Sequence, residues 1–240
     1  MEGTLGKVSY SFTLSALAVL GLVLVITAAL GTHAVVASHP KARSGNLSHT
    51  AHHWAAPAVL TAAAVVHLSR LQSPVALIGA LLAFGATAGL ALWLEYGTVD
   101  GAEAGYGRAR WMLNIVVYIV ALAVFSAAIT ADLPPQHAAI LCGLAAALLA
   151  IDILRQPGRT PDIAALYVGF VAALAGFAAH RLLLQEIAAI RISVLLLLLL
   201  YALTGVMQQQ LRGRASWRVR AEYLALLAVG AWALLRFGLS

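Results

Sequence analysis

Charged residues are scarce in this chain. Asp, Glu, Lys and Arg make up 10% of the 240 residues, whereas hydrophobic residues make up 62%. A soluble domain carries about 25% charged residues, and a chain this apolar has too few polar side chains to cover a surface in water. The composition therefore excludes a soluble globular domain and indicates an integral membrane protein in contact with the lipid bilayer.

Cysteine and lysine are nearly absent. Cys142 is the only cysteine, which excludes an intrachain disulfide, a thiolate zinc site and a Cys-x-x-Cys redox pair. The only lysines are Lys7 and Lys41, and neither lies in the middle of a hydrophobic run. A retinal Schiff base requires a buried lysine. A light-driven pump with covalent retinal is therefore excluded.

Long hydrophobic runs dominate what remains. They occur in eight blocks, each close to the length of about 20 residues that an α-helix needs to cross a bilayer. The sequence therefore predicts an all-α, polytopic transmembrane helix bundle that forms a single domain over residues 1–240. The predicted spans are Tyr10–Thr32, Leu47–Ser69, Pro74–Leu94, Trp111–Ala131, Gln136–Leu154, Asp162–Leu183, Ile187–Gln208 and Arg218–Leu239.

The number of spans leaves alternatives open. The link between the sixth and seventh spans is short, at Gln185-Glu186, and the second span has a polar start. A seven-span chain would fuse the sixth and seventh spans or omit the second. The count of eight also allows a four-plus-four pseudo-repeat of residues 1–131 and 132–240.

Basic residues are distributed unevenly between the two ends of the predicted bundle. The end reached by the odd-numbered spans, called here the Arg-rich face, holds ten of the fifteen: Lys41, Arg43, Arg108, Arg110, Arg155, Arg159, Arg212, Arg214, Arg218 and Arg220. The positive-inside rule places this face inside and both termini outside, with the cell membrane as the expected location. The formal charge of +6 is thus a topology signal, and no nucleic acid partner is expected.

Two predicted loops on the Arg-rich face are long enough to fold over a site. They are Thr32–Asn46 and Glu95–Arg110, and both are polar and contain glycine. Polar residues also occur within or at the ends of spans. Asn114 and Tyr118 share one helix face at i, i+4 spacing, which favours interhelical hydrogen bonds over a proton path. Asp152 and Arg155 are spaced to form a pair where the fifth span ends.

Eight histidines are the main chemical feature of the sequence, and the predicted spans place them in two layers. His33, His39, His49, His52 and His53 lie on the Arg-rich face, and His67, His137 and His180 lie on the opposite face. His53 and His67 are separated by about 21 Å along one helix and point within about 40° of each other. Ligands to two haems stacked across a bilayer need such a spacing.

Neutral imidazole is a common axial ligand of haem iron. Because consecutive helices usually pack together, His33 is the expected partner of His52 or His53. On the opposite face, His67 is expected to meet His137 or His180, and Arg108 and Arg110 are candidates to pair with haem propionates. Two alternatives remain open: a non-haem metal site, and histidines that serve only as interfacial residues at span ends.

A short N-terminal pattern is consistent with haem. The segment Thr27–His33, followed by His52–Ala56, resembles the first helix pair of haem A synthase-type proteins, over about 50 residues of the chain. Those are eight-helix proteins with two four-helix halves and histidine-ligated haem. Here the fourth and eighth predicted spans carry no histidine, and the loop cysteine pair of many members is absent. The resemblance therefore implies haem binding near His33 and His53 rather than the enzymatic activity.

The sequence thus yields two functional hypotheses, and it identifies no catalytic residue. In the first, the chain is a haem-binding membrane protein of the b-type cytochrome or haem-handling kind, which passes electrons between a quinol and a partner or holds haem for modification. In the second, it is a membrane transporter, or a cofactor-free subunit that binds other membrane subunits.

Overall fold

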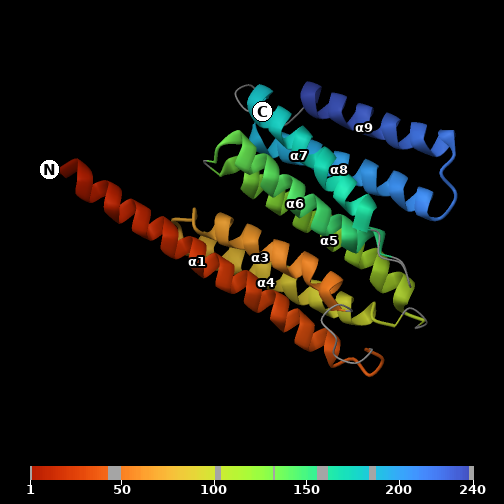
Figure 1. The fold of residues 1–240 in the computed structure, drawn as a ribbon, viewed down its shortest axis with the longest axis horizontal. Coiled ribbons are helices and arrows are strands. Elements are labelled where there is room, and N and C mark those ends of the chain that lie inside the picture. The colour runs from red at the N-terminus through yellow and green to blue at the C-terminus, as the bar shows by residue number, and fades with distance from the viewer. Residues whose placement is uncertain are drawn as a thin grey trace.

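The described part of the chain is entirely helical in the computed structural model (Figure 1). It covers residues 2–42, 50–100, 104–131, 133–155, 162–183 and 188–237. The elements in these residues are α1 (Glu2–Ala37), the 3₁₀ turn η1 (Ala51–Trp54), α3 (Ala55–Leu68), α4 (Pro74–Gly97), α5 (Tyr106–Thr130), α6 (Pro135–Leu154), α7 (Asp162–Leu182), α8 (Ala189–Leu211) and α9 (Trp217–Phe237).

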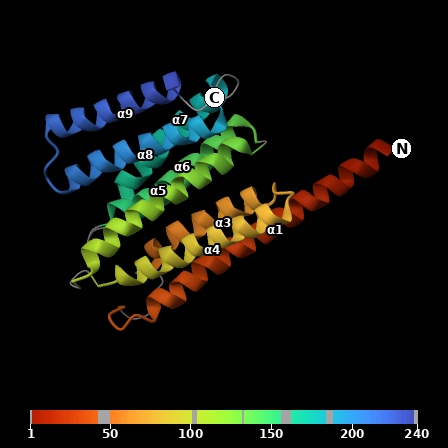
Figure 2. The ribbon, with the colours of Figure 1, turned by 180° about the vertical axis from the view of Figure 1, so that it is seen from behind.

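The helices form a bundle in which consecutive α-helices run in opposite directions, and η1 leads directly into α3. Helices α1, α3 and α4 lie on one side, α7, α8 and α9 lie on the other, and α5 and α6 lie between them (Figures 1 and 2). The N-terminal part of α1 projects beyond the other helices in both views. Fully buried Leu113, Val117 and Phe125 of α5 and Leu149 of α6 occupy the core, so α5 and α6 connect the two sides.

Within the part of the chain that the structure describes, six helices are long and apolar enough to cross a membrane. They are α4 to α8 and, within α1, the segment Val19–Ala37. Large hydrophobic side chains such as Val75 and Ile163 are at least 80% exposed on the surface of the bundle, as expected of helices in contact with lipid. Helix α3 has 14 residues, which corresponds to about 21 Å, and α9 carries charged residues near both ends.

Each of the eight predicted spans corresponds to a separate helix, although Leu47 and the Gln185-Glu186 link lie outside the described residues. Helices α7 and α8 are distinct and pack against each other, so the fused alternative is wrong at the level of helices. The predicted loop Glu95–Arg110 is also wrong at both ends, because α4 continues to Gly97 and α5 begins at Tyr106. Without a proline in that stretch, both helices extend past the apolar run.

Local sequence sets several helix ends. Ser73 caps α4 by accepting a hydrogen bond from the Ala76 amide, and Pro74 occupies the first helical position, where a missing N–H costs little. Helix α8 ends where Gly213 adopts a φ of +68°, a left-handed conformation that favours glycine after a helix. His33 lies inside α1 rather than at its end, because the helix continues to Ala37.

Small residues allow α6 and α7 to pack backbone against backbone. A Cβ atom added to Gly169 would lie 2.7 Å from the Ala147 Cβ and 2.7 Å from the Gly143 carbonyl oxygen. A Cβ added to Gly143 would lie 2.7 Å from the Ala173 Cβ. In a bilayer, where apolar burial between helices gains little, such close contact supplies much of the association energy.

The α6–α7 contact predicts opposite effects for two identical substitutions. Gly169→Ala should lower the free energy of unfolding by about 1–3 kcal/mol, the usual cost of overpacking a core. Gly85→Ala on α4, where nothing lies within 4 Å of the added Cβ, should leave stability unchanged or raise it, because alanine is the better helix former. Denaturant titration in detergent micelles measures both. Equal effects of the two substitutions would contradict this packing.

Candidate functional site

Five ionisable side chains from four elements meet near one end of the bundle. They are His53 of η1, Glu95 near the end of α4, Arg110 near the start of α5, Asp152 near the end of α6, and Arg155 just after α6. We call this group the buried charge cluster. It lies on the Arg-rich face, where α4 and α6 end and η1 and α5 begin.

Arg155 is the centre of the buried charge cluster. Its Nη1 lies 2.9 Å from His53 Nδ1. Its Nη2 donates to Glu95 Oε2 at 3.2 Å and to Thr98 Oγ1 at 2.9 Å, and the same atom is 3.8 Å from Asp152 Oδ1. One guanidinium therefore joins η1, the end of α4 and the end of α6, using the planar set of donors that arginine offers.

Arg110 completes the cluster from α5. Its Nη1 donates to Asp152 Oδ1 at 3.1 Å, and its Nη2 donates to the Asp152 carbonyl oxygen. Next to this contact, Gln208 of α8 donates from Nε2 to the Ile153 carbonyl oxygen at 2.9 Å. The end of α6 is thus held from α5 and α8 as well as from α4.

The cluster is removed from solvent and balanced in charge. The side chains of Glu95 and Asp152 are 0% exposed, and those of Arg155 and Arg110 are 11% and 12% exposed. Two carboxylates facing two guanidiniums give a net charge of zero if His53 is neutral. Such balance is required, because an unpaired buried charge costs several kcal/mol.

The His53 ring has two competing partners at one atom. His53 Nδ1 is in close contact with Glu95 Oε2 and also lies near Arg155 Nη1. A protonated Nδ1 can donate to the carboxylate, whereas an unprotonated Nδ1 can accept from the guanidinium. An unprotonated Nδ1 can instead accept from Glu95 in place of Arg155, provided that the Glu95 carboxyl group carries a proton. The geometry therefore allows the shared proton to reside on His53 Nδ1 or on Glu95 Oε2.

The histidines of η1, which lie outside the six candidate spans, are held neutral. Burial first, and then the positive charge of Arg155, lowers the pKa of His53 to about 2 and that of His52 to about 3. The two rings lie 4.3 Å apart between centroids, so a charge on one would also oppose a charge on the other. Both rings are therefore neutral near pH 7.

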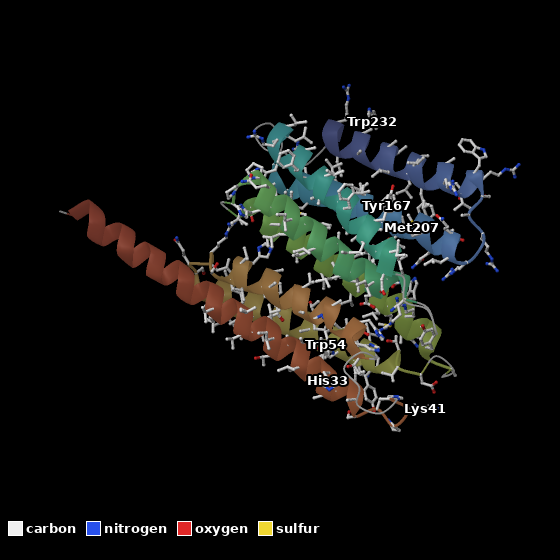
Figure 3. The ribbon with its side chains drawn as sticks, in the orientation of Figure 1. His33, Lys41, Trp54, Tyr167, Met207 and Trp232 are labelled. Atoms are coloured by element: carbon white, nitrogen blue, oxygen red, sulfur yellow. The ribbon has the colours of Figure 1, made fainter. Side chains whose placement is uncertain are left out.

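Contacts closer to the surface border the cluster. Lys41, after α1, pairs with Asp100 at 2.5 Å, and His39 packs edge-on against Tyr96 with centroids 4.7 Å apart. Figure 3 shows His33 and Trp54 close together, with Lys41 on the same side of the molecule. These contacts join the end of α1 to η1 and to the end of α4.

The structure brings some of the predicted site residues together. His52 and His53 are adjacent, and Arg110 joins the same cluster, but its partner is Asp152. His33 lies beside η1, with its Nδ1 2.7 Å from Thr50 Oγ1 and its ring 5.9 Å from that of Trp54. Arg108 is exposed on α5.

The histidines predicted for the opposite face lie on three different helices, α3, α6 and α7. His67 Nε2 lies 2.9 Å from the Ala123 carbonyl oxygen of α5, and the ring stacks on Phe84 at 6.2 Å. His137 is exposed at the start of α6, and His180 is half-buried near the end of α7. His49 lies outside the described residues. Within the described segments, no three His, Cys, Asp or Glu residues are grouped to hold a metal ion.

The predicted haem ligands differ in which ring nitrogen contacts a protein group. Ligating histidines commonly use one ring nitrogen for iron and hydrogen-bond the other to a carboxylate, carbonyl or water. His53 and His33 each engage a protein group through Nδ1 and retain Nε2. His67 engages a carbonyl through Nε2 and retains Nδ1.

Comparison with known proteins gives one match. A family model described as "Protein of unknown function (DUF5656)" matches residues 3–237. No curated protein and no solved structure matches the chain.

The central position of Arg155 predicts a large loss of stability when it is truncated. Arg155→Ala should lower the free energy of unfolding by about 3–5 kcal/mol, because it leaves buried Glu95 without its cationic partner. Exposed Arg108 is the matched control, and Arg108→Ala should change stability by less than about 0.5 kcal/mol. Denaturant unfolding in micelles checks both, and similar small losses would show that Arg155 does not organise the cluster.

Proposed function

The chain belongs to the DUF5656 family, and we propose that it is a proton-coupled membrane transporter whose buried charge cluster takes up one proton at Glu95. In this proposal all eight helices cross the cell membrane, with α3 as a short span and η1 at its end on the Arg-rich face. The Arg-rich face lies inside and both termini lie outside, according to the positive-inside rule.

The burial of ionisable groups in an apolar bundle supports this proposal. Charged residues within membrane helices are costly and commonly mark proton relays or ion pathways. Here two carboxylates and two guanidiniums are placed at the ends of α4, α5 and α6 with almost no exposure. A bundle that needed only packing could reach the same contacts with apolar side chains at lower cost.

The single observation that carries the proposal is the dual contact of His53 Nδ1 with Glu95 and Arg155. Two further carboxylate oxygens in the cluster lack a hydrogen-bond partner among the described residues. They are Glu95 Oε1 and Asp152 Oδ2, and both are buried. The proposal places the proton on Glu95 rather than on Asp152, because Glu95 is the carboxylate in contact with His53 Nδ1.

Protonation of Glu95 links proton uptake to helix movement in this proposal. The ionised carboxylate attracts Arg155, and a hydrogen bond between charged groups is roughly twice as strong as one between neutral groups. A neutral Glu95 would weaken the connection from α4 to Arg155, leaving Asp152 and Arg110 paired on α6 and α5. The end of α4 would then separate more readily from the end of α6 on the Arg-rich face.

A pH jump tests proton uptake without knowledge of the transported molecule. Proteoliposomes adsorbed on a solid-supported membrane should give a transient charge displacement when the outside pH is lowered, from the molecules whose Arg-rich face points outward, because protons enter the membrane field to reach Glu95. Glu95→Gln should abolish the transient.

Glu222→Gln is the matched control, since Glu222 is exposed on α9 and the chemical change is identical. The control should keep the wild-type transient. A Glu95→Gln protein that folds and keeps the full transient would reject the proposal, and so would a wild-type protein that gives none.

Haem binding is the second candidate function, and the His53–Glu95 contact favours it. A carboxylate at Nδ1 orients an imidazole and raises its basicity, leaving Nε2 available to iron. His33 on α1 would be the second ligand through its Nε2, and exposed Arg108 would be available to the propionates. Haem in this position would supply one-electron transfer, with a quinone or quinol as the partner.

Absorbance spectroscopy separates the two candidates. Under the haem proposal, protein expressed with haem available shows a Soret band, and His53→Ala removes it. His180→Ala, at the opposite face, should leave the band of this site in place. Purified wild-type protein without a Soret band would reject haem binding and would leave the proton proposal untouched.

A further inference from the structure

We infer that α3, α5 and α6 bind one acyl chain of a membrane phospholipid in an apolar cavity. This site is separate from the buried charge cluster and does not depend on the proposed transport. The cavity has a volume of about 240 Å³. Its lining is apolar throughout and includes Val59 and Ala63 of α3, Ala128 of α5, and Leu141, Leu144 and Leu148 of α6.

Water is a poor occupant of this cavity. A buried water molecule typically needs two to four polar partners, and apolar cavities remain dry or bind apolar molecules. At about 30 Å³ per water, the volume would hold about eight molecules, but the lining side chains offer no donor or acceptor. Hydrocarbon is therefore the occupant that matches the lining.

The cavity is continuous with the surface that faces the bilayer. Leu141, Leu144 and Leu148 line it and are also 45%, 58% and 43% exposed on the outside of α6. Ala62 on α3, across the cavity from α6, is exposed as well. An acyl chain can therefore enter sideways from the bilayer between α3 and α6, without passing through water.

The size of the cavity favours an acyl chain over a transmembrane helix as its occupant. A transmembrane helix is about 10–12 Å in diameter with its side chains, which is too wide for this space. Alanines at positions 62, 63, 127, 128 and 145 create the room, and an unbranched chain fits between the leucines of α6. The phospholipids of the bilayer supply such chains directly at the opening.

The position of the cavity indicates which leaflet supplies the lipid. From Val59, six residues after His53, the lining runs along α3 away from the buried charge cluster. At the far end it reaches Ala131 and Leu133, where α5 ends. The lipid therefore belongs to the leaflet opposite the Arg-rich face, with its headgroup beside the connection between α5 and α6.

Photo-crosslinking in vesicles tests this site. The full chain is reconstituted in phosphatidylcholine vesicles that contain a trace of phosphatidylcholine with a diazirine on one acyl chain. After irradiation, mass spectrometry of peptides locates the adducts. We expect adducts on Val124 and Ala128 of α5, which line the cavity and are half-buried and 4% exposed, in addition to those on the outer surface.

Two variants separate the cavity from ordinary lipid contact. Ala128→Phe fills the cavity and should abolish the adducts on Val124, while Ala86→Phe on the exposed surface of α4 should leave them unchanged. If Ala128→Phe does not yield folded protein, Ala131→Phe blocks the far end of the same cavity. Adducts confined to exposed residues, or adducts on Val124 that persist when the cavity is filled, would overturn the inference.

Discussion

The requirement that buried charges be paired organises one end of this molecule. Arg155 follows α6, yet its guanidinium contacts η1 through His53 and α4 through Glu95. Arg110 brings α5 to the same place through Asp152. None of these groups could remain buried alone, because the cost of an unpaired ion in an apolar interior exceeds the gain from most packing contacts. The ends of four elements are therefore fixed relative to one another by charge.

Away from the Arg-rich face the bundle is held by different interactions. Helices α6 and α7 stay together because Gly143 and Gly169 let their backbones touch, whereas α3 and α6 are separated by the apolar cavity. Near the cluster, η1 is joined to the end of α6 through His53 and Arg155, and farther along, α3 and α6 line the cavity. A change in the protonation of Glu95 would act at the cluster, and an acyl chain would fill the space between α3 and α6.

The positions of the helices were predictable because hydrophobic length is a local property of the sequence. Predicted helix ends failed where polar residues continue a helix, as at Glu95, Arg108 and Arg110. The cluster itself was hardly predictable. The Asp152–Arg155 pair follows from local spacing, but His53, Glu95 and Asp152 are more than 40 residues apart in sequence, and their meeting depends on how α3, α4 and α6 pack. An available signal was that both acidic residues fall at span ends on the Arg-rich face.

The prediction of two histidine layers was also limited, because the contacts of each ring depend on how the helices pack. Helical periodicity placed His53 and His67 on one helix face, but His53 lies in a 3₁₀ turn before α3, and the contacts of each ring come from other helices. Glu95 and Arg155 determine the chemistry of His53, and the α5 backbone determines that of His67. Whether His33 and His53 hold haem stays a prediction.

His53 is a neutral member of a closed, charge-balanced cluster. Nitrogen-15 NMR of histidine-labelled protein in bilayers, with His53→Asn to assign the resonance, measures this directly. The His53 ring should stay neutral as the pH falls well below 6.5, because burial and Arg155 lower its pKa. A His53 resonance that titrates near pH 6.5, as a solvent-exposed histidine does, would contradict it.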